Sequence, residues 1–134
     1  MKRFFALLVC ILIVSSLLVS CQDSELNLDD VYGTYVQESS TVITDRFYIT
    51  LSPDGTFQYL ETVFSSHIGV GDYSVDGNII TLTETIAKID NDGTNRIYKF
   101  KYQDNKLIFV KSESDEFLYV DLPDGAVFNR APQE

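Results

Sequence analysis

Alternation of apolar and polar residues is the feature that most constrains what this chain can fold into. In Tyr-Lys-Phe-Lys-Tyr at 98–102, three aromatic residues alternate with two lysines, and similar runs recur from Tyr32 onward. A period of two is typical of a strand with one buried face, whereas no stretch shows the 3.6-residue period of an amphipathic helix. The sequence therefore predicts an all-β fold.

Turn signals divide this region into consecutive strands. Ser-Pro-Asp-Gly at 52–55, Asp-Gly-Asn at 76–78 and Asp-Asn at 104–105 are typical of tight turns. We expect neighbouring strands to pair in antiparallel fashion. The eight predicted strands are 33–37, 47–51, 56–63, 68–75, 79–86, 95–103, 106–112 and 117–121.

Closure into a barrel is the economical architecture for such strands. An open sheet leaves two edges with unpaired backbone groups, and closure removes both edges. We predict a small antiparallel eight-stranded up-and-down barrel over 32–122, followed by a tail at 123–134. A two-sheet sandwich remains the alternative, because it produces the same alternation.

Large apolar side chains on the inward faces can fill the barrel or line a ligand cavity. Strands this short form a narrow barrel that holds side chains and at most a small ligand. We expect the filled case, because bulky residues dominate these faces. They are Phe57, Tyr59, Val63, Tyr73, Val75, Ile80, Leu82, Tyr98, Phe100, Leu107 and Phe109, and Glu61 shares its strand's face with the first three.

The first 20 residues have the pattern of an export signal. Lys2 and Arg3 precede an 11-residue apolar run at 4–14, which is shorter than the roughly 20 residues of a membrane span. Leu-Val-Ser-Cys at 18–21 then resembles the lipobox of bacterial lipoproteins. That resemblance implies cleavage before Cys21, lipidation of its thiol and anchoring in a bacterial envelope membrane. An uncleaved anchor is the alternative.

The cysteines and the residues that follow the signal agree with this interpretation. Cys10 is the other cysteine and would leave with the signal, so a mature chain could form no internal disulfide. Residues 22–31 are polar and acidic, which predicts that 21–31 form a flexible tether behind the lipidated Cys21.

Negative charge dominates the part of the chain after the signal. The sequence holds 10 basic and 20 acidic residues, and two of the bases lie in 1–20, so the remainder carries 8 − 20 = −12. This balance argues against binding of nucleic acid, whose phosphates need Lys and Arg, and against adsorption to anionic lipid. It would steer a basic partner toward the protein.

Four segments share an order and spacing with a known family: Gly-Thr-Tyr at 33–35, Leu-Ser-Pro-Asp-Gly-Thr-Phe at 51–57, residues 71–82 and Asn-Lys-Leu-Ile-Phe at 105–109. Together they resemble the small lipocalin-like domains of bacterial lipoproteins. The resemblance covers residues 31–121 and implies a β-barrel whose activity is at most binding. Tyr35 stands where lipocalins usually carry Trp, and the sequence shows no clear arginine of a final strand to pack across it, because Arg130 lies beyond the last predicted strand.

Few side chains are available for catalysis. The single histidine, His67, follows Ser65 and Ser66 between two predicted strands, a pairing that suggests a hydrolase. The sequence gives no sign of an orienting group or an oxyanion hole. We therefore expect a polar loop and no catalytic residue.

Metal sites are also not expected. Asp-Asn-Asp-Gly at 90–93 resembles part of a calcium loop, but Lys88 and Lys99 occupy its first and twelfth positions. The acids Glu113, Asp115 and Glu116 are typical of a solvated turn, without nearby His or Cys to bind a metal. The sequence predicts no cofactor.

These features together predict a lipid-anchored, non-enzymatic binding protein of the cell envelope. Its partner is a protein or a small apolar ligand. An inhibitor of a cationic enzyme such as lysozyme is an alternative, because the acidic surface would attract such a partner. A carrier of a small apolar ligand is another alternative, and it requires a hollow barrel.

Overall fold

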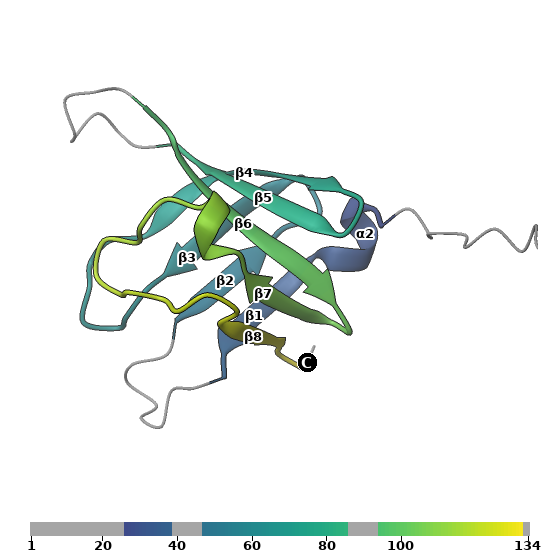
Figure 1. The fold of residues 1–134 in the computed structure, drawn as a ribbon. Helices are drawn as coiled ribbons and strands as arrows, with labels where there is room; N and C mark the ends of the chain where they lie inside the picture. Colours follow the sequence, from purple (N-terminus) through teal and green to yellow (C-terminus); the bar gives the residue numbers. More distant parts are fainter. Residues whose placement is uncertain (1–25, 39–46, 86–93, 133–134) are drawn as a thin grey trace, which may run out of the picture.

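Eight antiparallel strands form a closed barrel in the computed structural model, which describes residues 26–38, 47–85 and 94–132 (Figure 1). Each strand pairs with its neighbours in the sequence, and the last pairs with the first. The predicted up-and-down barrel is confirmed, and the sandwich alternative is wrong. The strands are β1 (Gly33–Gln37), β2 (Tyr48–Leu51), β3 (Thr56–Leu60), β4 (Gly69–Asp76), β5 (Ile79–Glu84), β6 (Arg96–Gln103), β7 (Lys106–Phe109) and β8 (Val127–Arg130).

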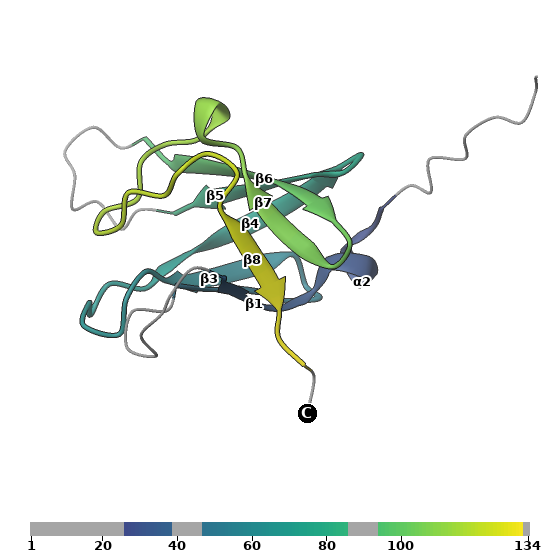
Figure 2. The ribbon, with the colours of Figure 1, turned by 60° about the horizontal axis from the view of Figure 1, so that its bottom comes forward.

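The strand that closes the barrel is not the predicted one. Residues 117–121 form no strand, and β8 lies in the segment that was expected to be a tail. β8 pairs with β1 on one side and with β7 on the other (Figure 2). The run at 117–121 misleads because four of its five residues are apolar, although in the structure Phe117 is its one buried residue and the burial does not alternate.

Arg130 therefore belongs to the final strand, and the expectation that it lies beyond the barrel is wrong. Its guanidinium carbon lies 5.8 Å from the ring centroid of Tyr32 and 5.9 Å from that of Tyr35. The guanidinium also donates to the Tyr32 carbonyl, while the buried Tyr35 hydroxyl donates to the carbonyl of Val31 at 2.6 Å. An arginine of the last strand thus packs across an aromatic residue of the first.

A short helix, α2 (Leu28–Val31), covers the barrel end at which the tight turns lie. Asn27 caps it, since its side chain accepts from the Asp29 backbone N–H and its own N–H donates to Asp30. Val31 is fully buried. Residues 28–31, which were expected to belong to a flexible tether, thus form a helix that packs against the barrel. Neither α2 nor the 3-10 helix η2 (Lys111–Glu113), the helices of the described ranges, could span a membrane.

Aromatic side chains pack the interior of the barrel. Phe128 contacts both Phe47 and Phe100, with ring centroids 5.2 and 5.7 Å apart. The Tyr59 ring lies so close to Gly69 that a Cβ there would meet it at 2.1 Å. The nine residues expected to be core or ligand-lining are at most 6% exposed, namely Phe57, Tyr59, Tyr73, Ile80, Leu82, Tyr98, Phe100, Leu107 and Phe109, whereas Val75 is only partly buried against them.

Short and long connections lie at opposite ends of the barrel (Figures 1 and 2). The turn between β6 and β7 has φ of 53° at Asp104 and 60° at Asn105, as a tight hairpin of primed type requires. The connection between β3 and β4 (61–68) and that between β7 and β8 (110–126) are longer and lie at the other end, which we call the long-loop end.

Candidate binding site at the long-loop end

A buried polar cluster lies inside the barrel near the long-loop end. Glu84, at the end of β5, is 2% exposed, and its Oε2 accepts hydrogen bonds from the hydroxyls of Tyr59 and Tyr98, both at 2.9 Å. Its other oxygen lies 3.2 Å from Nε2 of His67. Both carboxylate oxygens therefore have partners, which offsets the cost of removing the group from water.

The two phenols of this cluster remain protonated hydrogen-bond donors. Burial is the main cause that raises the pKa of Tyr59 and that of Tyr98 above the ordinary value for tyrosine, and the negative charge of Glu84 adds to both shifts. A protonated phenol donates to a carboxylate, so the pKa shifts and the geometry agree. The cluster is consequently a satisfied part of the core.

His67 has an orienting carboxylate, Glu84, that the sequence did not reveal. A hydrolase would also need a nucleophile on the imidazole. The Ser65 hydroxyl instead accepts from the His67 backbone N–H at 3.0 Å. In the described part of the chain, no serine hydroxyl is hydrogen-bonded to the ring of His67. The arrangement therefore supplies two of the three members of a catalytic triad, and the described residues place no serine nucleophile on the imidazole.

A second buried carboxylate holds the connection between β7 and β8 in place. Glu61, 1% exposed, accepts the backbone N–H groups of Leu118, Tyr119 and Val120 at 3.0, 2.6 and 2.9 Å. Hydrogen bonds to an ionised acceptor are about twice as strong as neutral ones. We call residues 114–122 the strap, because Glu61 ties them to the end of β3.

The strap places an aromatic side chain against the core of the barrel. The Phe117 ring stacks on Tyr98, with centroids 4.0 Å apart and planes 4° apart, and meets Phe47 edge-on at 4.8 Å. Phe117 is only 8% exposed. The run predicted as the eighth strand is therefore a cover for the interior at the long-loop end.

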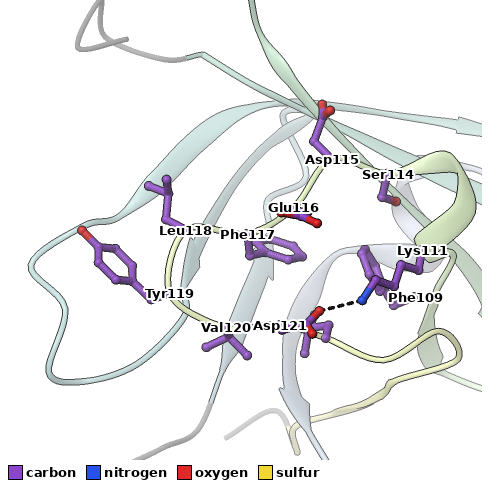
Figure 3. A pocket seen from close by; sticks show the side chains of 11 residues that line it. Phe109, Lys111, Ser114, Asp115, Glu116, Phe117, Leu118, Tyr119, Val120 and Asp121 are labelled. Carbon is purple, nitrogen blue, oxygen red and sulfur yellow. Dashed lines mark hydrogen bonds and ion pairs between the residues drawn. The ribbon is translucent and has the colours of Figure 1, made fainter.

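A pocket of about 450 Å³ lies between the strap and the end of β7 (Figure 3). Buried Phe109, Phe117 and Leu122 contribute its apolar surface. Charged groups also line it, and Lys111 Nζ lies 2.6 Å from Asp121 Oδ1. The lining residues are Phe109, Lys111, Ser114, Asp115, Glu116, Phe117, Leu118, Tyr119, Val120, Asp121 and Leu122.

Large apolar side chains are exposed on the connection between β3 and β4 and on the strap. The ring of Tyr119 on the strap lies 6.3 Å from that of His67, which joins the two connections at this point. Val63 was expected on an inward face, but β3 ends at Leu60 and Val63 is exposed. We call the group the apolar rim: Val63 (47% exposed), Phe64 (78%), Ile68 (57%), Leu118 (43%) and Tyr119 (62%).

The sequence places Glu61 on the inward face of its strand, as expected, but its role in holding the strap and the burial of Glu84 were missed, although the spacing contained the signal. Glu61 and Glu84 continue the period-two series of inward residues in β3 and β5, which predicts burial regardless of charge. Two of the acids that were expected only to face solvent in a turn, Glu113 and Asp115, have partners in the structure. Glu113 Oε2 lies 2.7 Å from Lys99 Nζ, and Asp115 accepts from the Ile97 N–H at 2.7 Å.

Other predicted features fall outside the described residues. These are Cys21, the export signal and the Asp90–Asp92 turn. Among the residues that are described, no group of three or more His, Cys, Asp or Glu side chains is placed to hold a metal ion. The candidate site thus consists of the strap, its pocket and the apolar rim.

Comparison with known proteins assigns the chain to no family. The chain matches no protein-family model, and neither the curated proteins nor the solved structures include a significant match.

Substitution of Glu61 tests whether the strap depends on its carboxylate. Glu61→Gln places an NH₂ group opposite backbone donors, so we expect the free energy of unfolding in urea to fall by about 2–4 kcal/mol. Hydrogen exchange should accelerate at the amides of Leu118, Tyr119 and Val120. Glu113→Gln removes the same charge from an exposed ion pair and should cost less than about 1 kcal/mol. Unchanged exchange at the three amides would contradict the role of Glu61.

Proposed function

We propose that this protein is a lipid-anchored, non-enzymatic binding protein of a bacterial cell envelope, which binds a basic protein through its long-loop end. One observation carries the proposal: five large apolar side chains are exposed together, three on the connection between β3 and β4 and two on the acidic strap. Exposed apolar groups gathered beside polar ones are typical of protein interaction sites.

The packed interior supports a site on the outside of the barrel. A carrier needs a hollow lined by apolar side chains, whereas the corresponding side chains here contact one another. Phe117 and the Glu84 cluster occupy the interior near the long-loop end. Binding at the rim and strap therefore accounts for the structure better than carriage of a small apolar ligand.

Charge supports a basic partner. Between Lys111 and Asp124 the chain holds five acids and one base, a local balance of −4. Such a surface attracts a cationic protein over a distance of about a Debye length and accelerates its association. A cationic enzyme directed at the envelope, such as a lysozyme, is one partner of this kind, and binding would then inhibit it.

The position of α2 supports an orientation in which the site points away from the membrane. Cys21 precedes Leu26 by five residues, so the intervening chain reaches at most about 18 Å. An eight-residue strand such as β4 is about 26 Å long. A lipid on Cys21 would hold the α2 end near the bilayer and leave the long-loop end accessible to a soluble partner.

Cys21→Ser tests the anchor. We expect the folded domain to remain intact while the protein moves from the membrane fraction to the soluble fraction, because the thiol is the proposed lipid attachment point. Far-ultraviolet circular dichroism serves as the control for folding. If the variant still sediments with membranes and resists carbonate extraction, the apolar N-terminal segment is itself the anchor.

Site-specific photocrosslinking in the native host cells tests the binding surface. A crosslinking amino acid at Phe64 or Tyr119 should capture one discrete protein with a basic isoelectric point. The same amino acid at Asp104, in the turn at the opposite end, should not capture it. Capture from Asp104 alone, or an acidic protein captured from the rim, would refute the proposed surface. Lysozyme activity with and without the purified chain then tests the inhibitor alternative.

A further inference from the structure

We propose that the pocket beside the strap is a subsite for a lysine or arginine side chain of the protein partner. This inference rests on the proposed function and names the chemistry by which the partner is recognised. The pocket of about 450 Å³ has an apolar floor and is also lined by carboxylates. These are the two surfaces that the aliphatic stem and the charged head of a basic side chain need.

The floor of the pocket suits the aliphatic stem of such a side chain. Phe109, Phe117 and Leu122 line it and are 3%, 8% and 2% exposed, so they present fixed edges rather than mobile side chains. Phe117 is held by its stack on Tyr98. A methylene stem laid over this surface removes water both from its own contacting face and from the apolar floor beneath it.

Glu116 is the carboxylate best placed to accept the charged head. Asp115 already accepts from the Ile97 N–H, and Asp121 is paired with Lys111. Figure 3 shows the Glu116 carboxylate beside the Phe117 ring, on the side of the strap that faces Lys111, while Tyr119 and Leu118 extend toward the other side. One carboxylate therefore faces the pocket beside its aromatic floor.

Lys111 shows that the pocket accepts an ammonium group. Its Nζ donates to Asp121 at 2.6 Å, and this hydrogen bond raises the pKa of Lys111. The side chains of the pair are 42% and 87% exposed, and an ion pair this exposed to water contributes little to stability. An incoming basic side chain can therefore replace Lys111 at Asp121 while it also meets Glu116.

Competition with Lys111 gives the inference an unusual test, because removal of a charged residue should strengthen binding. The probe is N-acetyl-arginine N-methylamide, titrated into the full chain in a neutral detergent and followed by the amide chemical shifts of residues 116–122. Lys111→Gln should tighten its binding about two- to five-fold, the equivalent of one exposed ion pair. Glu116→Gln should weaken binding by a similar factor.

The neighbouring ion pair supplies matched controls. Lys99 and Glu113 form a pair of the same type, 2.7 Å apart, and neither residue lines the pocket. Lys99→Gln and Glu113→Gln change the net charge by the same amounts and should each alter the affinity by less than about 1.5-fold, since only screened long-range attraction changes. N-acetyl-citrulline N-methylamide, which lacks the charge, should not bind.

Several results would overturn the subsite. One is that Lys111→Gln changes the probe's affinity no more than Lys99→Gln, or Glu116→Gln no more than Glu113→Gln. Another is that the citrulline compound binds as tightly as the arginine compound. A third is that the probe shifts only amide signals outside the strap. A failure here differs from a failure of the proposed function. If the Phe64 crosslink still captures a basic protein while the arginine probe does not bind, the binding surface stands and only the subsite is wrong.

Discussion

Pairing of the short strand β8 with both β1 and β7 is the constraint on which the rest of the structure depends. Without these ladders, β1 and β7 would each expose a row of unpaired backbone groups. The chain reaches the gap between them through residues 110–126, and this connection brings the strap over the interior. Barrel closure and the candidate binding site therefore depend on the same stretch of chain.

Two buried carboxylates make this arrangement specific. Glu84 fixes the hydroxyls of Tyr59 and Tyr98 within the interior, and Glu61 fixes the backbone of the strap. A buried charge without partners costs several kcal/mol, so each carboxylate favours the one arrangement that supplies its donors. The interior consequently carries structural polar groups, while the exposed rim and the pocket remain available for binding.

Elements that are specified by neighbouring residues could be predicted from the sequence, whereas those that depend on contacts between distant residues could not. Strands β1 to β7 lie close to their predicted positions, because alternation and turn residues are properties of adjacent residues. β8 was missed because it is four residues long and buries only Phe128. Residues 117–121 of the strap were predicted as a strand because the run is apolar. In the structure its side chains are instead divided between the core, as Phe117 is, and the surface, as Tyr119 is. That division depends on Glu61, more than fifty residues away in the sequence.

The central claim is that the barrel is filled and that binding takes place on its outside. Titration of the folded full chain with a fluorescent fatty-acid probe tests this most directly. The account predicts no saturable binding, because aromatic side chains occupy the interior. Saturable one-to-one binding that Phe100→Ala alters without unfolding the protein would contradict it and favour a carrier of small apolar ligands.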